Sequence, residues 1–225
     1  NENVSDLYEP GSTFKTLVSA IALEENITDT NINKDFYCKS YENINGTKIR
    51  CWSSKPHGYE TLTEALANSC NPAFMQLGQR IANQIGIDRL YDYFDAFGLF
   101  DKVGTSFARA YKGQLHDPNS IGPVELATTS FGENFTISPL QLLAAISAVA
   151  NDGVYVEPRI VKQIENPDTK SIEQAEVIEK RQVVSKETAD KVKNMMSSVV
   201  TDGTGRHARV EGYTIGGKSG TSEPA

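Results

Sequence analysis

A serine and a lysine three residues apart, Ser12 and Lys15, are the first residues in the chain whose types and spacing could do chemistry. On a helix this spacing places both side chains on one face. The lysine amine can act as a base toward the hydroxyl only if burial or neighbouring positive charge lowers its pKa. The helix N-terminus would also supply amides where an oxyanion forms. Alone, such a pair more often lies on a solvated helix face.

A second polar pair, Ser69 and Asn71, lies in a short break between two expected helices. A hydroxyl and an amide two positions apart on a turn can both point into a cleft. Asn71 precedes Pro72, so it also fits the first position of a helix as an N-terminal cap. Taken alone, the capping interpretation is favoured.

A third motif follows the glycine-rich residues 216–217 and is expected on a strand at the edge of a cleft. A lysine and two hydroxyl groups there could hold a substrate carboxylate: Lys218, Ser219 and Thr221. Gly220, which lies between the hydroxyl groups, would let a substrate backbone approach closely. The alternative is an exposed turn with no ligand.

Apolar periodicity, caps and turn signals predict the elements that position these motifs. Helices are expected at 11–25, 61–68, 72–85, 87–97, 139–151 and 185–200. A hairpin of 35–41 with 47–52 is expected around Asn45-Gly46, and a strand pair of 155–165 with 171–178 around the turn at 166–169. Residues 212–222 are expected to form a strand.

Composition limits the classes of function. The chain of 225 residues can bury a core as one large or two small domains, and its net charge of −7 argues against a nucleic-acid partner. Its longest apolar run, residues 142–150, is about half of what a membrane-spanning helix needs. Both ends look cut, so any membrane anchor is expected outside this sequence.

The three motifs occur in the order shared by penicillin-binding proteins and class A β-lactamases. Residues 8–15 resemble the nucleophile segment of class B penicillin-binding proteins almost letter for letter, and residues 132–141 and 202–205 resemble further stretches of that family. The resemblance runs from end to end of the chain. The segment from Cys51 to Pro72 looks most like the sporulation and division-type members of spore-forming Gram-positive bacteria.

The resemblance implies an α+β chain with the penicillin-binding protein and serine β-lactamase-like transpeptidase fold. Residues 1–225 would form one transpeptidase domain, truncated at both ends, that holds mostly the helical part and the Lys-Ser-Gly strand. Because the family's central sheet uses further strands, a complete five-stranded sheet is not expected from these residues alone.

The resemblance also implies an activity, D,D-transpeptidation of peptidoglycan stem peptides that end in D-Ala-D-Ala, with covalent inhibition by β-lactams. Ser12 would be the acylated nucleophile and Lys15 its base. Ser69 would relay a proton toward the leaving amine, and Lys218 would support that path electrostatically. Asn71 would hold the substrate amide. No cofactor is required for this chemistry.

The remaining roles implied by the resemblance concern the substrate and the partners. Ser219 and Thr221 would bind the terminal carboxylate beside Gly220, and the amides of Ser12 and Thr221 would form the oxyanion hole. The protein would be anchored in the cell membrane, face outward and work with a partner glycosyltransferase of the shape, elongation, division and sporulation type.

Three further classes of function remain open. The first is a class A β-lactamase, which needs a carboxylate that activates a deacylating water, but no Glu-x-x-Leu-Asn stretch lies between Asn71 and Lys218. The nearest stretch, residues 123–127, lacks the asparagine. The second class is a β-lactam sensor. The third is a non-catalytic cell-wall scaffold, although every reactive position is filled.

Three cysteines and one histidine fall within 33 residues and suggest a structural zinc site: Cys38, Cys51, His57 and Cys70. Three thiols and one imidazole suffice for a closed tetrahedral site, although the spacing C-x12-C-x5-H-x12-C is looser than that of a zinc finger. A Cys38–Cys51 disulfide, favoured by an extracellular location, and three packed thiols are the rival interpretations. Because Cys70 lies inside the Ser-x-Asn motif, a bound metal would pin that turn.

Overall fold

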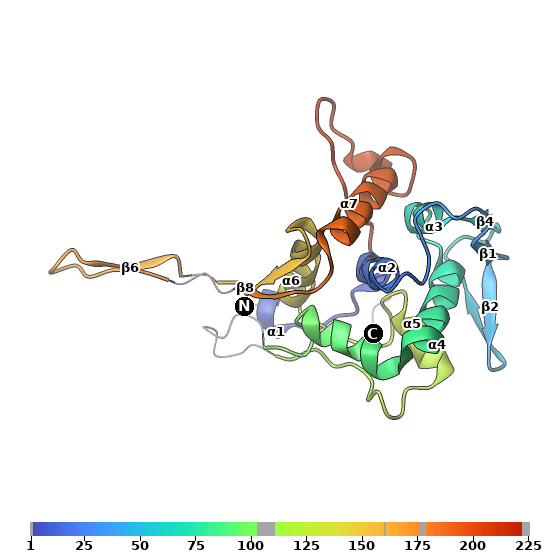
Figure 1. Ribbon diagram of the computed structural model, residues 1–225, viewed down its shortest axis with the longest axis horizontal. Helices are drawn as coiled ribbons and strands as arrows, with labels where there is room; N and C mark the ends of the chain where they lie inside the picture. The colour runs from blue at the N-terminus through green and yellow to red at the C-terminus, as the bar shows by residue number, and fades with distance from the viewer. Residues whose placement is uncertain (1, 103–110, 160, 176–178, 222–225) are drawn as a thin grey trace.

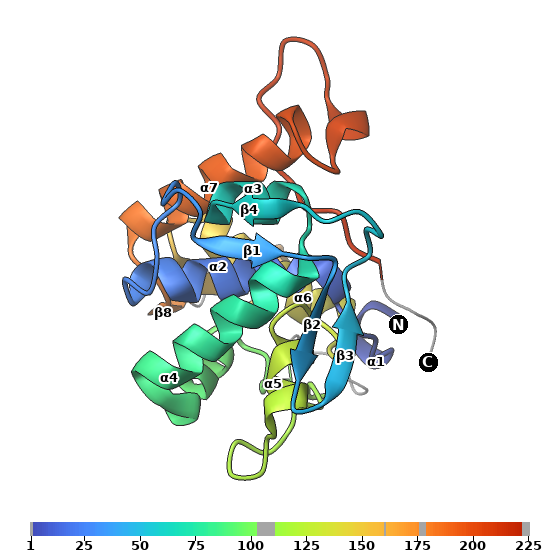
Figure 2. The same cartoon turned by 90° about the vertical axis from the view of Figure 1, so that its right-hand side faces the viewer.

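The helices of this computed structural model surround one buried helix, α2 (Lys15–Glu24), which follows the 3-10 turn η1 (Gly11–Phe14). The structure describes residues 2–102, 111–159, 161–175 and 179–221. The other helical elements are α1 (Glu2–Ser5), α3 (Leu62–Ala67), α4 (Asn71–Ala96), α5 (Pro123–Thr129), α6 (Pro139–Ala150), α7 (Lys186–Thr201) and η2 (Arg206–Ala208). Figure 1 and Figure 2 show α2 enclosed by α3, α4, α6 and α7.

The described strands form antiparallel pairs. In the first half of the chain β1 (Phe36–Cys38) pairs with β4 (Gly58–Glu60), and β2 (Tyr41–Ile44) pairs with β3 (Thr47–Arg50). In the second half β5 (Val154–Val156) pairs with β8 (Glu179–Gln182), and β6 (Gln163–Glu165) pairs with β7 (Ile172–Gln174). The β6–β7 hairpin extends away from the helices (Figure 1). The mixture of helices and small sheets agrees with the α+β class expected from the sequence.

The core is built around α2 because, apart from Lys15, its buried residues are apolar or small. Phe14, Leu17 and Ile21 are each fully buried, and they belong to one cluster with residues of α4, α6 and α7. Burial of a large apolar side chain stabilises the fold by about 1.5–3 kcal/mol. The helix that carries the first motif is therefore held on all sides.

The helix starts predicted at Thr61 and Ser138 are confirmed. Thr61 accepts a hydrogen bond from the amide of Glu64 and the Glu64 carboxylate accepts one from the amide of Thr61, which is the expected capping box of α3. Ser138 and Gln141 form the same arrangement at α6. The break expected between two helices at Gly86 is present as a non-helical residue (φ 82°, ψ 162°) inside α4.

Two local expectations are wrong in the first half of the chain. Residues 36–38 pair with β4 and not with residues 47–52, so the hairpin around Asn45-Gly46 contains only β2 and β3. The side chain of Asn71 does not cap α4, because Cys70 is the N-cap residue and Asn71 is already helical. Its amide group is thereby free to face Lys15.

Two further expectations are wrong in the second half. The long strand pair of 155–165 with 171–178 is divided: its outer part is the β6–β7 hairpin, whereas Tyr155 pairs with Arg181 of β8. Residues 176–178 lie outside the described residues. Residues 212–221 form no strand, since none of the described strands pairs with them. Instead, the amide of Gly217 donates to the carbonyl of Met196 on α7 (3.1 Å).

Within the described part of the chain, every helix is too short or too polar to cross a membrane.

Candidate active site

Ser12 lies in the tight turn η1 that leads into α2. The amide of Gly11 donates to the carbonyl of Gly132 (2.9 Å), which joins this turn to the segment after α5. A Cβ on Gly132 would lie 1.8 Å from the Gly11 carbonyl oxygen, so the approach requires glycine. From the core side, the ring of Phe14 packs on Phe135 with centroids 4.7 Å apart. The backbone of the serine is fixed from both directions.

The amine of Lys15 is the centre of the site, and its side chain is fully buried. Lys15 Nζ lies 3.0 Å from Ser12 Oγ, 2.6 Å from Asn71 Oδ1, and 2.8 and 3.3 Å from the carbonyl oxygen and Oγ of Ser69. Burial, followed by the charge of Lys218, lowers the pKa of Lys15 from 10.5 to about 7. Near neutral pH the amine can therefore accept the Ser12 proton.

The turn between α3 and α4 presents the second motif. Ser69 adopts a left-handed conformation (φ 55°), and the next amide, that of Cys70, donates to the carbonyl of Ala65 (2.9 Å). The indole nitrogen of Trp52 donates to the carbonyl of Asn68 (2.9 Å) and ties the turn to the segment after β3. This turn aims the Ser69 hydroxyl toward both active-site lysines.

The third motif approaches the same hydroxyl from the C-terminal end of the chain. Lys218 Nζ donates to Ser69 Oγ (2.9 Å) and to the carbonyl of Ser219 (2.8 Å). Burial lowers the pKa of Lys218 from 10.5 to about 8. The hydroxyls of Ser219 and Thr204 lie 2.8 Å apart. An unbroken chain of polar contacts thus joins Ser12, through Lys15 and Ser69, to Lys218.

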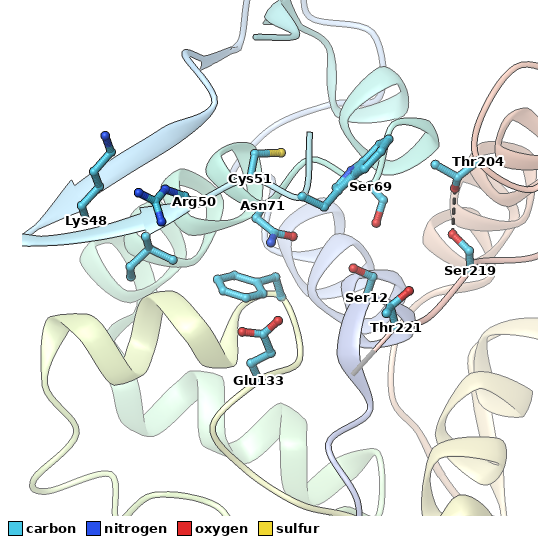
Figure 3. A pocket seen from close by; sticks show the side chains of 13 residues that line it. Ser12, Lys48, Arg50, Cys51, Ser69, Asn71, Glu133, Thr204, Ser219 and Thr221 are labelled. Carbon is cyan, nitrogen blue, oxygen red and sulfur yellow. Dashed lines mark hydrogen bonds between the residues drawn. The ribbon is translucent and has the colours of Figure 1, made fainter. Parts of the chain in front are cut away.

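The hydroxyl groups of Ser12 and Ser69 face a cleft of about 830 Å³ (Figure 3). Its lining includes Ser12, Ser69, Asn71, Ser219 and Thr221. A serine nucleophile, a buried amine, and hydroxyl groups at one end can together bind a carboxylate-ended substrate and carry out acyl transfer. The geometry therefore assembles residues that are far apart in the sequence: Ser69 and Lys218, which are in direct contact, are 149 positions apart.

Comparison with known protein families matches residues 1–225 to the family described as penicillin binding protein transpeptidase domain. The chain belongs to this family. Stage V sporulation protein D of Bacillus subtilis is 41% identical over 225 residues, which cover 99% of this chain and 34% of that protein. Penicillin-binding protein PbpB of Mycolicibacterium smegmatis is 32% identical over 231 residues. The chain spans about a third of the length of these two relatives.

Solved structures show the same fold. The D,D-transpeptidase domain of a peptidoglycan glycosyltransferase from Eggerthella lenta superposes with a TM-score of 0.91 at 27% identity, over 100% of this chain and 56% of that one. Penicillin-binding protein 3 of Mycobacterium tuberculosis, complexed with aztreonam, superposes with a TM-score of 0.89 at 28% identity, over 100% of this chain and 50% of that one. The resemblance to penicillin-binding proteins inferred from the motifs is confirmed.

The transpeptidase domain brings together the five residues predicted to be catalytic: Ser12, Lys15, Ser69, Asn71 and Lys218. Their individual chemical roles remain predictions. Gly220 is also close to the site, but a Cβ there would lie 2.8 Å from Thr13 Cγ2, so the protein itself crowds this position. Sequence reasoning missed several cleft residues: Lys48, Ile49, Arg50, Trp52, Phe131, Glu133 and Thr204. Thr204 and Glu133 lie in segments that carry the family resemblance, which is the signal that could have found them.

The cysteine cluster of the transpeptidase domain consists of Cys38, Cys51, His57 and Cys70, whose ligand atoms all lie within 4.8 Å of one another. Tetrahedral zinc with Zn–S near 2.3 Å needs ligand atoms about 3.3–3.8 Å apart, so a small contraction would close the site. The three thiols are free and buried, and His57 Nδ1 is buried without a hydrogen-bond partner. The residues therefore fit a metal ion.

Proposed function

We propose that this chain is the catalytic part of a peptidoglycan D,D-transpeptidase, acylated at Ser12 by stem peptides ending in D-Ala-D-Ala and by β-lactams. One observation carries the proposal. The fully buried amine of Lys15 lies 3.0 Å from Ser12 Oγ, and its pKa is lowered to about 7. The names of the related D,D-transpeptidases and penicillin-binding proteins support the same reaction.

In the acylation step, Ser12 Oγ attacks the carbonyl carbon of the penultimate D-Ala while the neutral amine of Lys15 takes the hydroxyl proton. The C–N bond to the terminal D-Ala then breaks. Its amine leaves with a proton delivered through Ser69 Oγ, which lies 2.9 Å from Lys218 Nζ and 3.3 Å from Lys15 Nζ. The product is an ester on Ser12 and free D-Ala.

In the transfer step, the amine of a second stem peptide attacks this ester. The attacking amine gives up one proton through Ser69 Oγ to Lys15, and the new amide bond forms. The Ser12–acyl bond then breaks, and the oxygen of Ser12 takes that proton from Lys15. Before acylation, the terminal carboxylate of the donor would be bound by Ser219 and Thr221, which line the cleft. Asn71 donates its side-chain amide N–H to the substrate, since its Oδ1 already accepts from Lys15 (2.6 Å).

Intact-protein mass spectrometry with benzylpenicillin tests this function. We expect one adduct per chain on the unmodified protein and none on Ser12→Ala. Ser147→Ala is the matched control, because Ser147 is exposed on α6 and does not line the cleft. Uptake by Ser12→Ala at the normal rate would refute the assignment. Fast loss of the adduct would indicate a β-lactamase, and a stable adduct without peptide exchange a sensor.

We also propose that Cys38, Cys51, His57 and Cys70 bind one zinc ion. Two parts of the chain meet there: the segment from β1 to β4, and the turn at the start of α4. When bound, the metal would serve as a structural cross-link. Cys70 is the N-cap of α4 and directly follows Ser69, so the cross-link would hold the catalytic turn in place.

Elemental analysis of protein purified without added zinc tests the metal proposal. We expect about one equivalent of zinc, reduced strongly in Cys38→Ser, which leaves the cleft lining unchanged. Removal of the metal by a chelator should lower the melting temperature. Protein without zinc whose mass is reduced by a disulfide would instead support a Cys38–Cys51 bond.

We further propose that the complete protein serves sporulation or division, is anchored in the membrane facing outward, and works with a glycosyltransferase. The likeness to stage V sporulation protein D supports the first part. The anchor and the partner are expected from the family. Membrane fractionation and co-purification of the full-length protein test them, and a protein recovered only in the soluble fraction would contradict the anchor.

A further inference from the structure

One wall of the cleft is formed by β3, which contributes Lys48, Ile49 and Arg50. Lys48 and Arg50 are two residues apart on a strand, so they share a face, and both are exposed. The partner strand supports them, since Tyr41 pairs with Arg50 and the amine of Lys48 lies 4.1 Å from the centre of the Tyr41 ring. Both cations are thus presented by a hairpin and not by a loose loop.

Within the described residues, neither Lys48 nor Arg50 forms an ion pair, although other cations of this chain do, among them Arg80, Arg89 and Lys186. Glu133 is the acidic residue in the described lining of the cleft. Figure 3 shows it beside Ser12, on a different wall from the two cations. The β3 wall therefore carries uncompensated positive charge.

The direction of a bound donor peptide follows from the positions of the other residues. Figure 3 places Ser219 and Thr221 on one side of Ser12, and Asn71, followed by Arg50 and Lys48, on the other. If the terminal carboxylate lies on the first side, the rest of the peptide leaves past Asn71 toward β3.

We propose that Lys48 and Arg50 form a subsite for a second carboxylate of the acyl donor, located on the N-terminal side of its D-Ala-D-Ala end. The inference rests on the proposed transpeptidase function and adds a substrate class to it: donors with an acidic group upstream of the scissile bond. A guanidinium and an ammonium both bind carboxylates through charge-assisted hydrogen bonds. Because the site is open to water, the effect on rate is moderate and weakens with salt.

Penicillins that differ only in the acyl side chain test the subsite, because the side chain takes the place of the upstream peptide. We would compare matched pairs in which a straight side chain of two to four methylenes ends in a carboxylate or in a carboxamide. The measured quantity is the second-order rate constant of Ser12 acylation, which involves the donor alone and no acceptor. The side-chain length that gives the largest difference in rate constant indicates which part of the donor supplies the second carboxylate.

At the side-chain length with the largest effect, the unmodified protein should react about fivefold faster with the carboxylate penicillin than with its carboxamide partner. In Lys48→Gln/Arg50→Gln, this ratio of the two rate constants should be close to one. Lys39→Gln is the matched control. It also removes a positive charge over Tyr41 (5.0 Å), but Lys39 does not line the cleft, so the ratio should be unchanged. On the unmodified protein, about 0.5 M salt should reduce the ratio without any mutation.

The subsite proposal would be overturned if the unmodified protein reacted equally fast with the carboxylate and carboxamide penicillins at every side-chain length. A preference for the carboxylate that survives the double substitution would also overturn it. Both results leave the proposed function intact, because they require acylation by the penicillins with a carboxamide side chain. If no penicillin acylates the unmodified protein, the proposed function fails and the subsite fails with it.

Discussion

The lowered pKa of Lys15 makes the pH dependence of acylation the sharpest test of the site. A lysine with the ordinary value of 10.5 would be neutral in about one molecule in a thousand at pH 7.5. With a pKa of about 7, about a tenth of Lys15 is neutral at pH 6 and about nine tenths at pH 8. Only the neutral amine can accept the Ser12 proton, so the rate must rise with pH.

We expect the rate of acylation by a fluorescent penicillin to increase about tenfold per pH unit below pH 7 and then to level off. Stopped-flow measurement between pH 5.5 and 9, with the melting temperature followed at each pH, separates ionisation from unfolding. Lys15→Arg should lose a factor of about 10²–10⁴ at every pH, because its guanidinium stays protonated.

The physical cause of the shift can be tested separately. Burial is the largest cause and the charge of Lys218 the second. Lys218→Gln removes a positive neighbour, so the pKa of Lys15 should rise and the ascending limb should move to higher pH. The role of Lys15 as base would be refuted by an acylation rate that is constant from pH 5.5 to 8. A rate that rises with a midpoint near the ordinary pKa of lysine would refute it as well.

Lys218→Arg should reduce acylation less than Lys15→Arg, mainly through weaker binding of the carboxylate end; equal and mild losses would contradict both roles. Gly132→Ala should cost about 2–4 kcal/mol of unfolding free energy, since its Cβ would lie 1.8 Å from the Gly11 carbonyl oxygen and its φ is 94°. Gly217→Ala, whose Cβ would lie 4.0 Å from its nearest neighbour, is the control in urea unfolding. If the cysteine cluster binds the proposed zinc ion, a chelator should slow acylation as well as lower the melting temperature, and an unchanged rate would argue against any link to the catalytic turn.

Helices and their starts could be predicted because their causes are local. The capping boxes at Thr61 and Ser138 each depend on a partner three residues away, and the break at Gly86 depends on one residue without a Cβ. Ser12 and Lys15 are also close in sequence, so their shared face could be predicted. The order of the three motifs, together with residues 8–15, 132–141 and 202–205, was sufficient to recognise the family.

The two hairpins around Asn45-Gly46 and residues 166–169 could be predicted from their turns, but pairing between distant strands could not, because a short strand selects its partner by packing and not by its own pattern. The segment Phe36–Cys38 has the composition of a hairpin strand, yet it pairs with Gly58–Glu60, where it also packs beside α4. Residues 212–221 have a strand-like composition but are bound to α7 through the amide of Gly217. In both places a distant partner determined the outcome.

The sequence by itself determined which groups the site contains, and the tertiary structure decided what they can do. The sequence motifs contain a serine, two lysines and a cluster of thiols. No local sequence feature specifies that Lys15 contacts Ser69 and Asn71, which are 54 and 56 residues away. That meeting buries the amine and, with Lys218, lowers its pKa to about 7. Desolvation and the field of a second charge exist only once the chain has folded, which is why the sequence could predict a base at Lys15 but not the lowered pKa that this role needs.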